Sequence, residues 1–224
     1  MSLPAISVPA KSGRTKGLLV ILHGWGASAQ DVAALASYLD LPDYQFLFPN
    51  APFPHPYSPT GKMWYGLPSD YSVFSSLEFL QQTELQESRI QLVSWLQSLE
   101  KTTGIPLTRT ILGGFSQGGA MTLDVGLFRP FAALMVLSGY LHPLRQPSEL
   151  ELAKNAPAQF PPILLVHGRQ DRVVPLNAAH QARDRLQQIG AGVQYFEQDM
   201  GHEIDSLVLR HMQSFIEEIP LSTE

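Results

Sequence analysis

The chain has 224 residues, 44% hydrophobic and 16% charged, and a formal net charge of -5 at pH 7. This length and composition predict one domain over residues 1–224 with a substantial core. The acidic balance argues against nucleic acid as a partner, because phosphate binding needs clustered Lys and Arg. The absence of cysteine excludes disulfides, thiolate zinc sites and a cysteine nucleophile.

Neither a secretory signal nor a membrane span is visible in the sequence. The first residues lack a basic region followed by a long apolar run. No segment approaches the eighteen or so uninterrupted apolar residues that a spanning helix needs. We therefore expect a cytoplasmic protein without stable membrane insertion.

Apolar runs alternate with segments of helical periodicity along the chain. The runs have the continuous apolar character of strands covered on both faces of a parallel sheet, and they lie at 17–23, 44–48, 111–115, 132–138 and 163–166, with an alternating strand at 193–197. Apolar residues recur at helical spacing over 28–39, 83–101, 116–128, 175–189 and 204–216. The alternation predicts a doubly wound α/β domain, a mostly parallel sheet with helices on both faces.

Two irregular stretches interrupt this pattern. The first, 53–74, holds several aromatic residues among prolines and glycines, including Trp64 and Tyr65, and the second runs over 139–162. Long structureless loops are uncommon in compact domains and are often functional. The aromatic residues could wall an apolar binding cleft, with Trp64 and Tyr65 as candidate substrate contacts, or could pin the loop to the surface.

The segment that follows the strand at 111–115 contains Gly114-Phe115-Ser116-Gln117-Gly118, a Gly-x-Ser-x-Gly motif. In this motif the serine occupies a sharp turn between strand and helix, and the small flanking residues let the two backbones approach closely. Glycine and serine at such a position are also ordinary turn residues. The motif alone therefore leaves catalysis and simple turn formation both open.

The order of three side chains along the chain favours catalysis. Ser116, Asp171 and His202 each follow a predicted strand, where functional groups of open α/β sheets gather. Serine, acid and histidine in this order are typical of α/β-hydrolases. His202 would accept the serine proton, and Asp171 would hold the imidazole in the correct tautomer.

Negative charge would develop on the acyl oxygen when Ser116 attacks, and backbone N–H groups must stabilise it. The turn supplies the N–H of Gln117. The loop His23-Gly24-Trp25, which follows the first predicted strand, should supply the second N–H from Trp25.

Other acids and histidines are weaker candidates. Asp199 and Asp205 flank His202 and are the alternatives to Asp171, of which Asp199 is the better, whereas Asp124 should point away from the serine turn. Among the histidines, we expect His23 and His167 to bind backbone groups, His211 to pack in the core and His180 to be solvated. His55 and His142 lie in the irregular stretches and stay open as candidates. No metal-ligand spacing, dinucleotide motif or phosphate-binding loop is present, so we expect neither a metal nor a cofactor.

With these residues identified, the chain resembles the carboxylesterase, phospholipase and acyl-protein thioesterase family of small α/β-hydrolases. The matching segments are 22–26, 113–120, 167–175 and 201–202. The resemblance implies an α/β-hydrolase fold without a large cap domain, a Ser116-Asp171-His202 triad, an oxyanion hole formed by Trp25 and Gln117, and a possible homodimer.

Two positions depart from the family pattern and concern the choice of substrate. Ala27 stands where an acidic residue is usual, and the aromatic motif reads Trp64-Tyr65-Gly66 without its usual Asp. We predict a cofactor-free serine carboxylesterase for short or medium acyl chains, with lysophospholipids or acyl thioesters as further substrates. The alternatives are an amide or peptide hydrolase and a non-catalytic α/β-hydrolase-fold protein that binds a small ligand.

Overall fold

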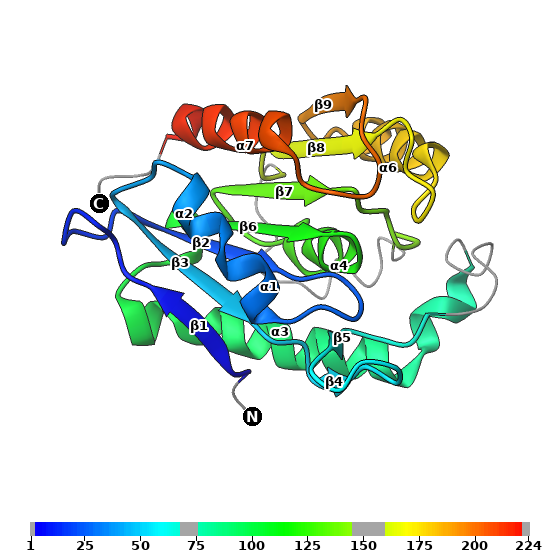
Figure 1. Ribbon diagram of the computed structural model, residues 1–224, viewed down its shortest axis with the longest axis horizontal. Coiled ribbons are helices and arrows are strands. Elements are labelled where there is room, and N and C mark those ends of the chain that lie inside the picture. Colours follow the sequence, from blue (N-terminus) through cyan, green and yellow to red (C-terminus); the bar gives the residue numbers. More distant parts are fainter. Residues whose placement is uncertain (1–2, 68–75, 145–159, 221–224) are drawn as a thin grey trace.

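A computed structural model describes residues 3–67, 76–144 and 160–220 (Figure 1). Within these residues seven strands form one sheet in the order β1-β3-β2-β6-β7-β8-β9. Their bounds are β1 Ala5–Val8, β2 Gly17–Leu22, β3 Tyr44–Pro49, β6 Thr110–Phe115, β7 Ala133–Leu137, β8 Ile163–Gly168 and β9 Val193–Gln198. All neighbouring strands are parallel except β1, which pairs antiparallel with β3. The predicted α/β-hydrolase architecture is confirmed.

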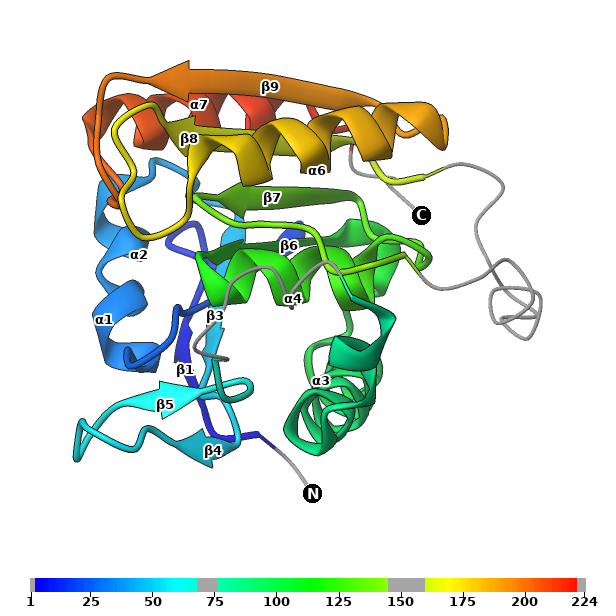
Figure 2. The ribbon, with the colours of Figure 1, turned by 90° about the vertical axis from the view of Figure 1, so that its right-hand side faces the viewer.

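The helices cover both faces of the sheet, as predicted (Figures 1 and 2). One face carries α1 (Ala29–Ala33), α2 (Leu35–Tyr38) and α7 (Ser206–Glu218). The other carries α3 (Thr83–Thr103), α4 (Gln117–Gly126) and α6 (Leu176–Gln188). The helix predicted over 28–39 is two short helices that meet at Ala34.

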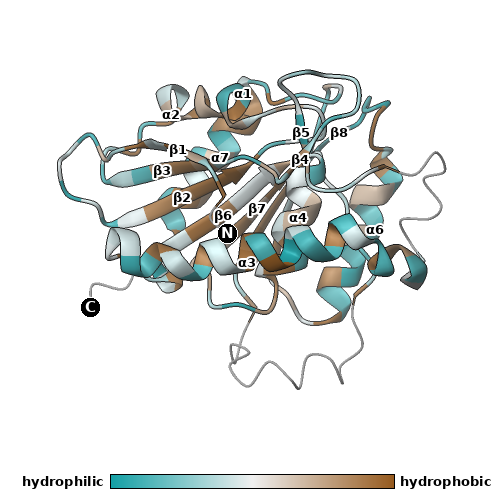
Figure 3. Cartoon of the chain, turned by 90° about the horizontal axis from the view of Figure 1, so that it is seen from below, coloured by the Kyte–Doolittle hydropathy of each residue, from teal (hydrophilic) through white to brown (hydrophobic). Residues whose placement is uncertain are grey.

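Strand side chains supply the cores of both layers. Along β2, Leu18 and Leu22 pack into the core shared with α3, α4 and α6, whereas Leu19 and Ile21 pack into the core shared with α1, α2 and α7. All four are fully buried, and each contributes roughly 1.5–3 kcal/mol relative to exposure. Figure 3 shows the mostly hydrophobic central strands between helices that carry many hydrophilic residues. The continuous apolar runs of the sequence follow from this two-sided burial.

Short elements occupy the connections. The 53–67 segment contains a two-stranded ribbon of β4 (Phe53–Pro54) and β5 (Lys62–Met63), while η2 (Leu77–Gln81) and η3 (Leu107–Arg109) are single 3₁₀ turns that flank α3. Tyr71 and Phe74, which belong to the predicted aromatic loop, lie outside the described residues. No helix in the described parts of the chain combines the length and apolar character needed to cross a membrane.

Candidate active site

Ser116 occupies a strained turn between β6 and α4. Its backbone has φ 56° and ψ -118°, a conformation that L-residues rarely adopt and that is concentrated at functional sites. The turn is held from both sides, because the Ser116 N–H donates to the carbonyl of Leu137 at 2.8 Å and its carbonyl accepts the N–H of Ala120 at 3.1 Å. The strand-to-helix turn that Gly-x-Ser-x-Gly predicted is therefore present.

The glycines of this motif allow the close backbone contacts that the turn requires. A Cβ on Gly114 would lie 2.3 Å from the backbone of Gly118, and a Cβ on Gly118 would lie 2.3 Å from the carbonyl oxygen of Leu22. A Cβ on Gly24 would lie 3.3 Å from Ser116 Cβ. Ser116 consequently lies directly beside the loop that follows β2.

Asp171 and His202 are in direct contact. The Nδ1 of His202 lies 2.7 Å from Oδ2 of Asp171, while Oδ1 accepts the N–H groups of Val173 and Val174, each at 2.8 Å. The carboxylate side chain is fully buried and the imidazole is 16% exposed. Because the carboxylate accepts from Nδ1, the neutral ring keeps its basic lone pair on Nε2.

Two further contacts bring this pair to the serine edge of the sheet. A Cβ on Gly168, the last residue of β8, would lie 2.3 Å from the carbonyl of Gly201, so the loop that carries His202 packs onto the end of that strand. The rings of His202 and Phe115 have centroids 4.7 Å apart. Phe115 immediately precedes Ser116, and His202 therefore lies next to the serine turn.

The sequence alternatives to Asp171 have other partners. Asp199 lies at the surface, where its carboxylate binds Nη1 of Arg169 at 2.7 Å. Asp205 is the N-cap of α7 and accepts the N–H groups of Leu207 and Val208. Asp171 is therefore the acid that the described structure places on His202.

The remaining histidines are held by neighbouring groups. His23 accepts the N–H of Ala51 at Nε2, so the ring is neutral and Nδ1 donates to the carbonyl of Gly24; burial also lowers the pKa of His23. His167 donates from Nε2 to the carbonyl of Val174 at 2.9 Å, and burial lowers its pKa too. The backbone contacts predicted for these two are confirmed. His180 binds Glu197, and His211 stacks on Phe196.

Trp64 and Tyr65, the predicted substrate contacts, are both fully buried. The indole N–H of Trp64 donates to the carbonyl of His23 at 3.0 Å. The Tyr65 hydroxyl lies 2.6 Å from the hydroxyl of Tyr140 and 2.8 Å from Nε2 of His142. A substrate contact by either ring stays a prediction.

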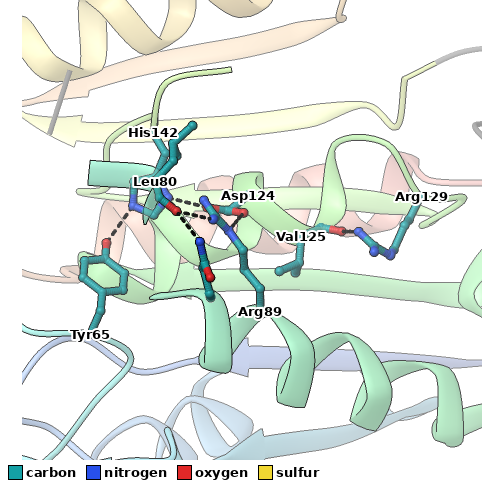
Figure 4. Close-up of polar contacts among 8 residues, drawn as sticks. Tyr65, Leu80, Arg89, Asp124, Val125, Arg129 and His142 are labelled. Carbon is teal, nitrogen blue, oxygen red and sulfur yellow. Dashed lines mark hydrogen bonds and ion pairs between the residues drawn. The ribbon is translucent and has the colours of Figure 1, made fainter. Parts of the chain in front are cut away.

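A buried charged cluster extends from Tyr65 into the helical layer (Figure 4). His142 Nδ1 lies 2.5 Å from Oδ2 of Asp124, and Arg89 of α3 binds the same carboxylate through Nε at 2.6 Å and Nη2 at 2.7 Å. Burial alone would raise the pKa of Asp124, but His142 and Arg89 together hold it well below its usual range. That Asp124 points away from the serine turn stays a prediction. Arg89, by contrast, lies inside the helix layer rather than on the outer face of α3.

An apolar cavity of about 320 Å³ opens beside these residues. Its walls come from the loop after β7, from the residues just before α6 and from α6 itself. Most of the lining is apolar, including Tyr140, Leu141, Leu144, Val174 and Ala178, and His142, Asn177, Gln181 and Arg185 add polar groups. Small-molecule sites in proteins have this character, with mostly apolar walls and volumes of roughly 300–1,000 Å³. The sequence predicts only an irregular stretch over 139–162 and not the cavity, because the cavity forms between residues that are far apart in the chain. In the described residues no group of three or more His, Asp or Glu is placed to hold a metal ion.

The family model and the sequence relatives that match this chain point to the same group of proteins. Residues 3–219 match the family model described as phospholipase/carboxylesterase. An acyl-protein thioesterase 1 from Yarrowia lipolytica is 32% identical in an alignment of length 190 that covers 81% of this chain and 80% of the relative. The acyl-protein thioesterase 1 of Neurospora crassa is 31% identical in an alignment of length 231 that covers 96% of this chain and 91% of the relative.

Solved structures agree with the sequence relatives. The crystal structure of esterase PE8 has a TM-score of 0.84 and 31% sequence identity, and the match covers 98% of this chain and 100% of that chain. The acyl-protein thioesterase 2 of Zea mays has a TM-score of 0.73 at 21% identity, with 96% of this chain and 97% of that chain covered, which is a likeness of fold.

Proposed function

The chain belongs to the phospholipase/carboxylesterase family and is an ester- or thioester-hydrolysing enzyme, and we propose that it acts through an acyl-enzyme on Ser116. The observation that carries this proposal is the 2.7 Å contact between His202 Nδ1 and Asp171 Oδ2. It lies at the same sheet edge as the strained serine turn. A buried carboxylate that orients an imidazole beside a serine is the arrangement that activates a hydroxyl nucleophile.

Acylation begins when Ser116 Oγ attacks the acyl carbon and its proton passes to Nε2 of His202. The Asp171 carboxylate stabilises the imidazolium that forms. The backbone N–H groups of Gln117 and Trp25 donate to the oxyanion, and each is worth about 3–4 kcal/mol of barrier lowering. The carbon–oxygen or carbon–sulfur bond then breaks, and the leaving alkoxide or thiolate takes the proton from His202.

Deacylation repeats these steps with water as the nucleophile. His202 removes a proton from the water as its oxygen attacks the acyl carbon of the Ser116 ester. Collapse of the second tetrahedral intermediate releases the carboxylic acid and returns the proton to Ser116 Oγ. No group outside the chain is needed for any of these proton transfers.

The cavity between the loop after β7 and α6 is the proposed acyl site. Val174, which lines it, also donates its backbone N–H to Asp171, so the cavity shares a wall residue with the segment that holds the proposed acid. Its apolar walls suit the hydrocarbon chain of a short or medium acyl group. The names of the thioesterase relatives support thioesters beside oxygen esters as substrates.

The family match over 3–219 supports a single catalytic domain. A homodimer and a cytoplasmic location stay predictions from the sequence. The apolar walls of the cavity favour small acyl substrates over peptides as the class to test first.

The proposal is tested by hydrolysis of p-nitrophenyl esters of increasing chain length, with wild type compared to Ser116→Ala. We expect wild-type turnover with an optimum at short or medium chains, and loss of turnover in Ser116→Ala with an unchanged thermal unfolding midpoint. Mass spectrometry after a rapid quench should find an acyl adduct on Ser116. If folded wild type and variant were equally inert on oxygen esters and thioesters, the proposal would fail, and the ligand-binding alternative would replace it.

A further inference from the structure

Trp64 is bound to two separate segments that border the serine. Its backbone N–H donates to Oε1 of Gln117 at 2.9 Å, and its indole N–H donates to the carbonyl of His23 at 3.0 Å. Its own carbonyl accepts the hydroxyl of Ser88 from α3. The residue is fully buried, so each of these hydrogen bonds is shielded from competition with water.

The contact with Gln117 fixes the first residue of α4. Gln117 is 1% exposed, and its side-chain amide is held at both ends, because Oε1 accepts from Trp64 N–H and Nε2 donates to the carbonyl of Tyr65 at 2.7 Å. A primary amide is the side chain that matches an adjacent backbone donor and acceptor. The segment 64–65 therefore holds the residue whose N–H is proposed to bind the oxyanion.

The contact with His23 fixes the opposite side of the proposed oxyanion hole. His23 begins the loop that carries Trp25, and its ring is bound to Gly24 and Ala51. Trp64 adds a hydrogen bond to the His23 main-chain carbonyl, and the two rings have centroids 5.7 Å apart. Trp64 thus joins the loop after β2 to the start of α4, and these two segments supply one proposed oxyanion donor each.

We infer that Trp64 is a positioning residue that fixes the two oxyanion donors relative to each other, an inference that rests on the proposed function. Donors stabilise an oxyanion only when both lie about 2.7–3.1 Å from the position it will occupy. Displacement by roughly 1 Å of a group that fixes catalytic geometry can cost about 100-fold in rate. Ground-state substrate has little charge on that oxygen, so the effect belongs to kcat rather than to KM.

The test is Trp64→Phe, which keeps a buried aromatic ring but removes the indole N–H donor together with part of the ring volume. We expect kcat on p-nitrophenyl butyrate to fall about tenfold with KM within about twofold of wild type. The Ki of an alkyl trifluoromethyl ketone, which forms a tetrahedral oxyanion adduct on the serine, should rise by the same factor as kcat falls. The matched control is Trp95→Phe in α3, a buried tryptophan in the core, which should leave kcat and Ki unchanged.

The second variant, Gln117→Met, removes the amide contacts to 64–65 but keeps the backbone N–H of residue 117. It should show the same joint change in kcat and Ki, and it decides the question if Trp64→Phe does not fold. The inference would be overturned if a folded Trp64→Phe had the kcat and Ki of wild type. If Trp64→Phe is unfolded, the same result in a folded Gln117→Met would overturn it. If the folded wild-type enzyme hydrolysed neither oxygen esters nor thioesters and did not bind the trifluoromethyl ketone, the proposed function would be overturned instead.

Discussion

Asp171 and His202 lie on separate loops, 31 residues apart, yet Nδ1 of the imidazole is 2.7 Å from Oδ2 of the carboxylate. The other carboxylate oxygen accepts two backbone N–H groups. Those two bonds fix the carboxylate in one orientation, so that Oδ2 remains directed at the ring. The ring is thereby kept in the tautomer with its basic lone pair on Nε2.

Asp171→Asn should lower kcat by about four orders of magnitude, because an amide nitrogen that faces Nδ1 favours the wrong tautomer. The measurement is kcat on a p-nitrophenyl ester, with circular dichroism to verify the fold. Asp199→Asn is the matched control, since Asp199 lies at the surface on Arg169, and it should retain wild-type kcat. A small effect at Asp171 combined with a large one at Asp199 would reverse our assignment of the acid.

Much of this arrangement could be predicted from the sequence, because parallel strands buried on both faces appear as continuous apolar runs. The strand that ends at the serine is apolar on both faces, and the next residues form the Gly-x-Ser-x-Gly turn. β1 escaped prediction because it is four residues long and partly exposed, with a single antiparallel pairing to β3. The split between α1 and α2 also escaped, because the apolar spacing continues across it.

Contacts between distant segments carry little local signal. The aromatic loop predicts that Trp64 lines a binding cleft. In the structure its indole N–H donates to the carbonyl of His23, 41 residues away in the chain. In the sequence, Arg89 cannot be distinguished from the other charged residues of an amphipathic helix. Its partner Asp124 lies on α4, 35 residues further along the chain. The pairing of such residues depends on tertiary packing, which a single sequence does not specify.

The proposed acyl site predicts a shift in chain-length preference. Ala178 lines the cavity from the first turn of α6, so Ala178→Phe should fill part of it. We expect kcat/KM for the longest accepted ester to fall tenfold or more, since each excluded methylene costs about 1–3 kcal/mol, while acetate hydrolysis stays within about twofold.

The control for this experiment is Ala33→Phe, which adds the same ring on the other face of the sheet and should leave the chain-length profile as in wild type. The p-nitrophenyl ester series measures both variants. A uniform loss at every chain length in Ala178→Phe would place the acyl chain outside this cavity.

The buried pair of Arg89 and Asp124 predicts a large effect on stability. Asp124→Asn leaves the guanidinium without its bidentate partner, and the side chains of this pair are 9% and 3% exposed. Removal of one partner of a buried pair costs about 3–5 kcal/mol. The double variant Arg89→Met with Asp124→Leu should recover part of that loss, because the guanidinium is no longer left unpaired, while His142 Nδ1 lacks its acceptor at a cost of about 1–3 kcal/mol.

The carboxylate of Asp124 also makes the difference in unfolding free energy between wild type and Asp124→Asn depend on pH. His142 and Arg89 hold the pKa of Asp124 well below its usual range despite the opposing effect of burial. A carboxyl group with a depressed folded-state pKa stabilises the protein above its unfolded pKa, about 3.9, and loses that contribution as the pH falls toward the folded pKa. Urea unfolding at pH 7 and at pH 3 should therefore find a smaller difference between wild type and Asp124→Asn at the lower pH. An equal difference at both values would mean that the carboxyl group is not held as an anion by Arg89 and His142.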